Sequence, residues 1–295
     1  MSSAGQAQTA KALVESSNPH AVVRRGGQIH WPAEAIWEAV SPRLPGFSVE
    51  VLPEIDSTNS ELMRRSRAGQ IDPVLLVAEH QSAGRGRLGR QWFSGQSEHT
   101  GGSDFTAAHL PSLSFSFGLP LAPQDWSGLS LAVGLSIVES LHPDLQLKWP
   151  NDVWWQSRKL AGILIETASV GDVRYAVVGV GINIEPRDGS GLSTPPASLS
   201  ELLPGMDAPA ALARVVEPLV RAIQRFEARG FSELRTAFHG RDLLYGQTVQ
   251  CSDGLTGVAR GVDACGALLV HTENGLNRIT SAEVSVRPAA CANPI

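Results

Sequence analysis

Several features that would place a chain in a familiar class are scarce or absent in this sequence of 295 residues. It has only three cysteines, Cys251, Cys265 and Cys291, and none belongs to a Cys-x-x-Cys or Cys/His pattern. We therefore expect free thiols in a reducing cytoplasm rather than a structural zinc site. No apolar run approaches the roughly 18 residues of a membrane span. The N-terminus also lacks the apolar core of a secretory signal.

Common catalytic motifs are also missing. There is no Gly-x-Ser-x-Gly elbow, no His-Glu-x-x-His pair and no Gly-Lys-Ser/Thr phosphate loop. His99, Asp104 and His109 lie in the polar segment 95–111, where a solvated flexible loop is favoured over a metal site. The net charge of −5 argues against a general nucleic-acid binder, although a local basic loop could still hold a small anion.

The apolar pattern predicts an α+β fold followed by a small all-β unit. Strand-like runs are concentrated in the middle of the chain without strict β–α alternation, which favours a layered mixed sheet. The predicted strands are 48–52, 74–78, 113–117 (half-buried), 145–149, 161–167 and 173–184. The predicted helices are 33–40, 58–67, 129–141 and 212–226, the last bent or tolerated at Pro218. The short strands 248–251, 257–261, 267–271 and 278–286 predict a β-barrel after a boundary near residues 244–246.

The most informative segment is 81–90, QSAGRGRLGR, which follows an apolar run. Its glycines allow the backbone to come close to a ligand, and its three arginines can neutralise an anion. The glycine spacing does not fit a Rossmann fingerprint. These residues therefore predict an anion-binding loop, and Trp92 just after it could either pack in the core or cover a nucleotide.

Three further segments could carry chemistry. The polar run 56–59, DSTN, is either a plain helix cap or a set of donors and acceptors for a polar ligand. Lys148 in KWPND, with Lys159 downstream, could neutralise an anion at a strand end, or could be a strand lysine beside a Pro-Asn-Asp turn. The glycines of 179–183, GVGIN, indicate a bulge, close packing or a ligand lying across a strand.

Together these segments resemble the biotin–protein ligases. They occur in the family's order as DSTN (56–59), GRGRLGRQW (84–92), KWPND (148–152), RKLAGILIE (158–166) and GVGIN (179–183), and GVDACGALLV (261–270) is similar to the C-terminal barrel. The resemblance covers about residues 47–290. It implies a class II synthetase-like catalytic domain at 46–244 and an SH3-like barrel at 245–290. An N-terminal extension, 1–45, precedes them and is expected to be partly disordered.

The resemblance also implies a reaction and a set of site residues. The family joins biotin to ATP as biotinyl-5′-AMP and transfers it to a lysine of the biotin carboxyl carrier domain of acetyl-CoA carboxylase. Lys148 and Arg87 would be catalytic. The implied biotin-binding residues are Ser57, Thr58, Asn59, Gln81, Arg85, Gly86, Arg87 and Lys148. The implied ATP- and adenylate-binding residues are Arg87, Arg90, Trp92, Lys148, Lys159 and Asn183, with Asn183 reading the adenine edge.

Other partners follow from the same resemblance. Mg²⁺ is implied for the ATP phosphates, with no ligands assigned. Asp152 could orient Lys148, accept a proton from the acceptor lysine, or close a structural turn. A monomer and a homodimer stay open as alternatives.

Two departures from the family pattern matter. Bifunctional members carry a DNA-reading helical unit of about 60 residues ahead of DSTN. Only 55 residues precede Asp56 here, so we expect a monofunctional cytoplasmic ligase that binds neither DNA nor membrane. The second departure is the segment 95–111, which reads as an insertion near the site. Two alternative functions remain: a lipoate or octanoyl ligase of the same fold, and a biotin-sensing regulator that acts by binding alone.

Overall fold

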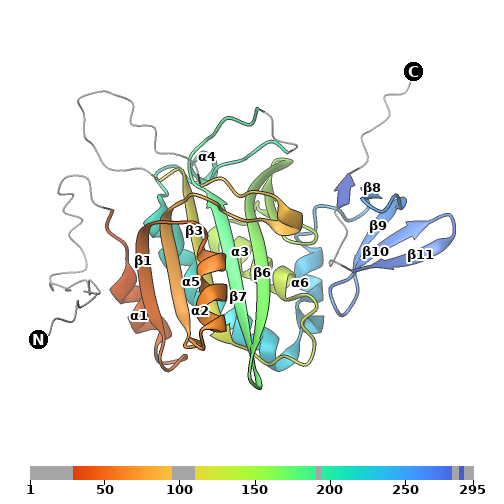
Figure 1. The fold of residues 1–295 in the computed structure, drawn as a ribbon. Coiled ribbons are helices and arrows are strands. Elements are labelled where there is room, and N and C mark those ends of the chain that lie inside the picture. Colours follow the sequence, from red (N-terminus) through yellow and green to blue (C-terminus); the bar gives the residue numbers. More distant parts are fainter. Residues whose placement is uncertain (1–28, 95–109, 191–193, 281–285, 289–295) are drawn as a thin grey trace, which may run out of the picture.

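The computed structural model describes residues 29–94, 110–190, 194–280 and 286–288. The sequence-based expectations for residues 1–28, for His99, Asp104 and His109, and for Cys291 lie outside these ranges. Two sheets organise the described chain (Figure 1). The larger has the strand order β1-β2-β3-β7-β6-β5-β4, and the smaller has the order β11-β10-β9-β8-β12.

The larger sheet is mixed, which confirms the predicted α+β class. β1 pairs in parallel with β2, and the other neighbours are antiparallel. Its strands are β1 (Ser48–Ile55), β2 (Val74–Gln81), β3 (Ser112–Pro120), β4 (Gln146–Lys148), β5 (Asp152–Trp155), β6 (Arg158–Val170) and β7 (Val173–Asn183).

Helices cover both faces of this sheet. On one face α3 (Leu129–Leu141) packs against α5 (Ala208–Arg229), which also contacts α1 (Ala33–Val40). On the other face lies α2 (Thr58–Arg67), in front of the sheet in Figure 1. Successive side chains of β2 point to opposite faces of the sheet. Leu75 and Val77 belong to the main core, whereas Val74 and Leu76 pack with residues of α2 on the other face.

The helix predictions are largely confirmed. α1, α2 and α3 have the predicted bounds, and α5 runs uninterrupted through Pro218. Two short helices, α4 (Leu199–Leu202) and α6 (Arg235–His239), were not predicted. Among the described residues, no helix combines the length and the apolar character needed to cross a bilayer.

Two strand predictions are wrong. β3 is not half-buried, because every residue from Ser112 to Leu119 is buried, the serines included. The predicted strand 278–286 is interrupted at Thr280: β11 (Gly275–Ile279) ends just before this residue, and β12 (Val286–Pro288) begins at residue 286. β5 was missed because its first residue belongs to the expected Pro-Asn-Asp turn.

The smaller sheet is antiparallel throughout, as the turn-rich C-terminal sequence predicts. Its other strands are β8 (Thr248–Cys251), β9 (Thr256–Val262) and β10 (Leu268–Thr272). One continuous core of buried residues extends from β4 into this sheet. The two sheets are therefore packed together rather than joined by a loose linker.

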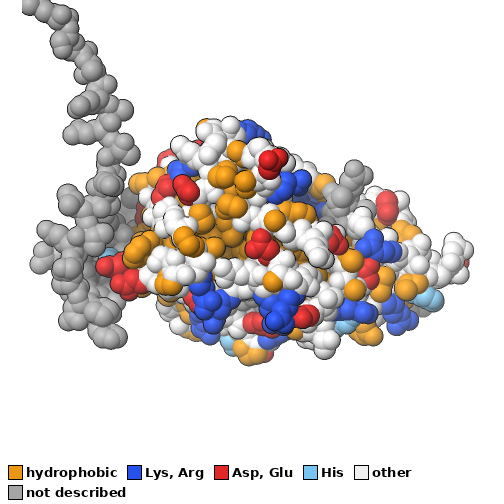
Figure 2. Space-filling model, turned by 90° about the horizontal axis from the view of Figure 1, so that it is seen from below, with side chains coloured by type: hydrophobic (Ala, Val, Ile, Leu, Met, Phe, Trp, Pro, Cys, Tyr) orange, Lys and Arg blue, Asp and Glu red, His pale blue; other side chains and the backbone are white. Residues whose placement is uncertain are grey.

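The surface carries mixed charges. Figure 2 shows one face, on which Lys/Arg and Asp/Glu side chains alternate around an apolar centre. On α2, for example, Arg65 lies 2.8 Å from both Glu61 and Glu50. Side chains of both charge signs are therefore mixed on the face that Figure 2 shows.

Candidate functional site

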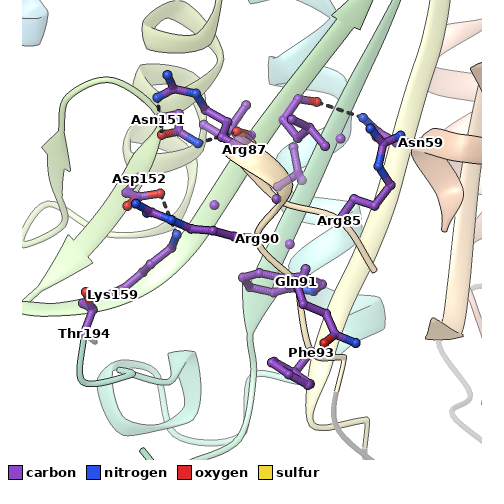
Figure 3. A pocket seen from close by; sticks show the side chains of 18 of the residues that line it. Asn59, Arg85, Arg87, Arg90, Gln91, Phe93, Asn151, Asp152, Lys159 and Thr194 are labelled. Carbon is purple, nitrogen blue, oxygen red and sulfur yellow. Dashed lines mark hydrogen bonds and ion pairs between the residues drawn. The ribbon is translucent and has the colours of Figure 1, made fainter. Parts of the chain in front are cut away.

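The predicted site residues converge on one cavity of about 740 Å³ over the sheet face that also carries α2. Figure 3 shows Asn59 and Arg85 on one side of it and Asn151, Asp152 and Lys159 on the other. Eleven residues assigned from the sequence line it: Ser57, Thr58, Asn59, Gln81, Arg85, Gly86, Arg87, Arg90, Trp92, Lys148 and Lys159. Segments far apart in the chain thus form a single site.

The polar run at the start of α2 serves as both cap and cavity wall. Ser57 is the N-cap, and its hydroxyl accepts from the amide of Ser60 at 3.4 Å. Asp56 does not line the cavity; its carboxylate accepts from Arg64 at 2.7 Å, which lowers its pKa to about 2. The cap is therefore confirmed at Ser57, and the role of Ser57, Thr58 and Asn59 as ligand donors and acceptors stays a prediction that their place in the lining allows.

Thr58 and Gln81 form a buried hydrogen-bonded corner. The amide of Thr58 donates to Gln81 Oε1 at 2.8 Å, and its hydroxyl oxygen lies 2.7 Å from Ser116 Oγ. The Gln81 amide nitrogen makes no hydrogen bond within the described part of the chain, and it belongs to a cavity-lining side chain. This corner can therefore donate to a ligand carbonyl while its other groups stay fixed.

Asn59 crosses the floor of the cavity to β6. Its amide nitrogen donates to the Leu164 carbonyl at 3.2 Å and to Glu166 Oε2 at 3.0 Å, and its oxygen accepts from Ser116 at 2.6 Å. The amide lies directly over Gly179 of β7, where a methyl group would overlap it. Asn59 can occupy this place only because residue 179 has no side chain.

Gly181, two residues along the same face of β7, has the same role for Trp92. A methyl group at Gly181 would overlap the indole ring, whose nitrogen donates to Ser114 Oγ at 3.1 Å. The register of β7 with both neighbours is regular at these positions, so the glycines do not mark a bulge. They accommodate Asn59 and Trp92 at neighbouring places along one face of the strand.

The Arg/Gly loop is held by its own backbone. The amide of Trp92 donates to the Gly84 carbonyl at 2.9 Å, and the amide of Gly86 donates to the Arg90 carbonyl at 2.7 Å. At its tip Leu88 has a left-handed backbone (φ 56°) and is exposed. The loop therefore forms a small closed structure that presents its arginines toward the cavity.

Arg85 and Arg87 are anchored on opposite sides. Arg85 lies 3.0 Å from Glu166 Oε1, and Glu166 also accepts from Asn59, so one carboxylate joins the loop to the cavity floor. Arg87 donates to Asn151 Oδ1 at 3.3 Å. Burial lowers the pKa of the Arg87 guanidinium; Asp152 opposes this shift and Arg90 adds to it.

Two lysines lie on the β4–β6 side. Lys148 ends β4 with its Nζ 5.2 Å from the centre of the Trp154 ring. Lys159 Nζ lies 2.7 Å from Asp152 Oδ1. Asp152 therefore pairs with Lys159, a contact that is not among the roles that the sequence left open for it.

The structure does not bring Asn183 into the cavity, where the predicted contact with adenine would place it. Asn183 is fully buried and does not line the cavity. Its amide nitrogen donates to the carbonyls of Lys159 and Ala197, at 3.1 and 2.9 Å. The side chain therefore holds two segments together behind the site.

The sequence analysis missed two residues of the site. Arg187 follows β7, lines the cavity and lies over Trp92. Glu166 does not line the cavity but pairs with Arg85. Glu166 ends the recognised RKLAGILIE segment, so its motif could have found it. The alternating serines of β3 were a signal too, because Ser114 and Ser116 hold Trp92 and Asn59.

Comparisons with known proteins agree with this geometry. Residues 51–183 match the model of the biotin/lipoate A/B protein ligase family, and residues 246–287 match the biotin protein ligase C-terminal domain. The bifunctional ligase/repressor BirA of Escherichia coli is 34% identical over 258 residues, covering 84% of this chain and 76% of that protein.

Two further relatives extend the comparison. The biotin–[acetyl-CoA-carboxylase] ligase of Mycobacterium tuberculosis is 34% identical, covering 75% of this chain and 82% of that protein. The structure of the Aquifex aeolicus biotin protein ligase in complex with biotin and ATP superposes with a TM-score of 0.66 at 29% identity. It covers 82% of this chain and 99% of that one.

Proposed function

The chain belongs to the biotin protein ligase family, and on that premise we propose that it activates biotin with ATP and transfers it to a carrier protein. The observation that carries this proposal is the cavity itself. A hydrogen-bonding corner at Thr58 and Gln81 and a group of cations line the same continuous space. A polar uncharged ring and two anions could therefore be held together.

In the first step the biotin carboxylate attacks the α-phosphate of ATP, and pyrophosphate leaves. Two anions must approach each other, so cations that offset their repulsion lower the barrier. We assign this role to Lys148 and Arg87, with Arg90 and Lys159 on the phosphates. Arg87 donates to Asn151, which fixes its direction before ligands bind.

The polar end would hold the ureido ring of biotin. Its N–H and C=O groups are costly to bury without partners, and Ser57, Thr58, Asn59 and Gln81 offer both donors and acceptors. Arg85 and Gly86 would contact biotin and the adenylate from the loop, and Trp92 would shield the nucleotide.

In the second step the acceptor lysine attacks the carbonyl of the mixed anhydride, and AMP leaves. The names of the relatives point to a carboxylase carrier domain as the acceptor. Because the anhydride reacts with water, the Arg/Gly loop would shield it between the two steps.

Mg²⁺ would accompany ATP rather than occupy a preformed protein site. Among the described residues, no three His, Cys, Asp or Glu side chains are grouped to hold a metal ion. Asp152 is the carboxylate in the cavity lining, and it pairs with Lys159. The ATP phosphates would therefore supply most of the ligands.

The test is ATP- and biotin-dependent labelling of a biotin carboxyl carrier domain by the wild type, Lys148→Ala and Arg174→Ala. Arg174 is exposed and does not line the cavity, so its variant should label like the wild type. We expect labelling by the wild type and a loss of at least about a hundredfold in Lys148→Ala. A carrier domain whose acceptor lysine is replaced by arginine should stay unlabelled.

Two outcomes would contradict the proposal. Tight biotin binding without labelling would favour a regulator that acts by binding alone. Labelling with lipoate in place of biotin would favour the lipoate ligases, although residues 246–287 match a domain named for biotin protein ligases.

A further inference from the structure

Arg187 is a cavity residue to which neither the sequence motifs nor the proposed reaction gives a task. It lies in the loop after β7, with its guanidinium carbon 5.6 Å from the centre of the Trp92 ring. Its Nη1 donates to the carbonyl of Phe93 at 3.0 Å. Arg187 therefore reaches across to the segment that follows the Arg/Gly loop, at the Trp92 end of the cavity.

The charge of Arg187 is unbalanced within the described part of the chain. Arg85 pairs with Glu166 and Lys159 pairs with Asp152, but Arg187 forms no ion pair with any described carboxylate. Its Nε is buried and has no hydrogen-bond partner there. Burial also lowers the pKa of its guanidinium. A half-buried cation without a counter-ion is costly, so the arrangement favours an anion that arrives with a ligand.

The position of Arg187 indicates which part of the ligand would meet it. Asn59 over Gly179 and Trp92 over Gly181 occupy neighbouring places along one face of β7. The hydrogen-bonding corner of Thr58 and Gln81 belongs to the Asn59 end, because Ser116 joins Thr58 to Asn59. Arg187 belongs to the Trp92 end. The contacts of Arg187 are with Trp92 and Phe93, and none is with Thr58, Gln81 or Asn59 within the described part of the chain.

We propose that Arg187 is a nucleotide-binding residue, which donates from its guanidinium to a phosphate oxygen of ATP while its planar group packs on Trp92. The proposal rests on the proposed function, because it takes ATP as the substrate at this cavity. It assigns a contact outside the Arg/Gly loop and outside the KWPND segment. The charge-assisted hydrogen bond would strengthen ATP binding without affecting the affinity for biotin.

The experiment compares Arg187→Ala, Arg187→Lys and Arg187→Gln with the wild type, measuring KM for ATP and KM for biotin by pyrophosphate release. Arg174→Ala is the matched control, because Arg174 also lies 5.6 Å from a tryptophan ring, that of Trp126, but away from the cavity. We expect KM for ATP to rise about tenfold in Arg187→Ala. KM for biotin should change by less than about twofold.

Charge and structural support can be separated with the other variants. Arg187→Lys keeps the charge and should recover part of the ATP affinity, whereas Arg187→Gln keeps a donor for the Phe93 carbonyl but should not. KM for ATP should also depend less steeply on salt in Arg187→Ala than in the wild type.

An unchanged KM for ATP in Arg187→Ala would overturn the inference. Equal increases in both KM values, or full recovery in Arg187→Gln, would also overturn it, because these results indicate that Arg187 only supports Trp92 and the loop. If the wild type forms no biotinyl-adenylate, the proposed function fails as well, and that result appears without any variant.

Discussion

Arg87 is the least exposed of the three arginines in the Arg/Gly loop. Its guanidinium donates to Asn151, a residue of the KWPND segment, so it joins the loop to the strand end that carries Lys148. Burial disfavours the charged form of Arg87, and a phosphate bound beside the guanidinium would favour that form again. We therefore expect Arg87 to retain the adenylate intermediate as well as to stabilise its formation.

Arg87→Gly should release biotinyl-adenylate faster than the wild type, by about tenfold or more, because a charge-assisted hydrogen bond is lost. The measurement is a single-turnover experiment in which labelled adenylate is formed on the enzyme and its escape is followed after adding excess unlabelled biotin. Arg87→Ala separates the loss of charge from the added flexibility of glycine. Equal or slower release in both variants would show that the loop holds the intermediate without this side chain.

The sequence predicted individual site residues well where they lie in contiguous motifs. Ser57, Gln81, Arg87 and Lys148 all meet in the cavity. The motif gave the position of Asn183 along its strand but not the partners of its side-chain amide, which donates to backbone carbonyls behind the cavity. Arg187 was missed because no local pattern surrounds it, and its meaning depends on Trp92, far away in the chain.

At the scale of the element, β7 leaves room for the site because two of its residues, Gly179 and Gly181, have no side chains. Gly179→Ala should displace Asn59 and raise KM for biotin, whereas Gly181→Ala should displace Trp92 and raise KM for ATP. Overpacking costs roughly 1–3 kcal/mol, so we expect each effect to be about tenfold or more. Steady-state kinetics with each substrate varied in turn measures both.

Each of these glycine variants is the control for the other, because the same methyl group is added to the same face of the same strand. If both variants raised the two KM values equally, the cavity would not be divided between an Asn59 end and a Trp92 end. Thermal unfolding of both variants would show whether the strand itself has been damaged.

The extent of the elements was harder to predict than their existence. β2 was expected to end at Ala78 but continues to Gln81, because the backbone of its polar last residues still pairs with β1. The serines of β3 suggested a solvated face, yet they are buried because Trp92 and the start of α2 cover them. Alternation reveals the period of a strand but not what packs on its polar face.

At the scale of the whole molecule, the segment 241–243 joins the two sheets. The Leu147 amide donates to the Arg241 carbonyl at 2.7 Å, and the Leu243 amide donates to the Leu147 carbonyl at 2.9 Å. The predicted boundary near residues 244–246 lies just beyond this pairing. Local composition could not reveal this pairing, because the pairing joins Leu147 to residues almost 100 positions later in the sequence.

Asp242 makes this junction sensitive to pH. Burial raises the pKa of its carboxyl from 3.8 to about 6. Between these values the folded protein keeps a proton that the unfolded chain releases, so the free energy of unfolding falls as pH rises. The loss approaches about 3 kcal/mol above pH 6. Asp242→Asn, which resembles the protonated form, should therefore stabilise the protein more at about pH 7.5 than at about pH 4.5.

Urea unfolding of the wild type and Asp242→Asn at both pH values measures this difference, and Asp172→Asn provides an exposed control. Other carboxyl groups titrate in both proteins, so only the difference between variant and wild type reports on Asp242. A difference that stays constant between the two pH values would rule out this role for the junction.

The pairing around β4 also has a consequence for synthesis on the ribosome. The indole nitrogen of Trp149, next to Lys148, donates to the carbonyl of Gly266, which lies 117 residues later in the chain. Nascent chains fold from the N-terminus as they emerge. The strand that carries Lys148 therefore lacks its outer neighbours until the C-terminal sheet has been translated. A nascent chain would therefore contain the Arg/Gly loop before the strand end that carries Lys148 is fully packed, which delays adenylate formation until the C-terminal sheet has been translated.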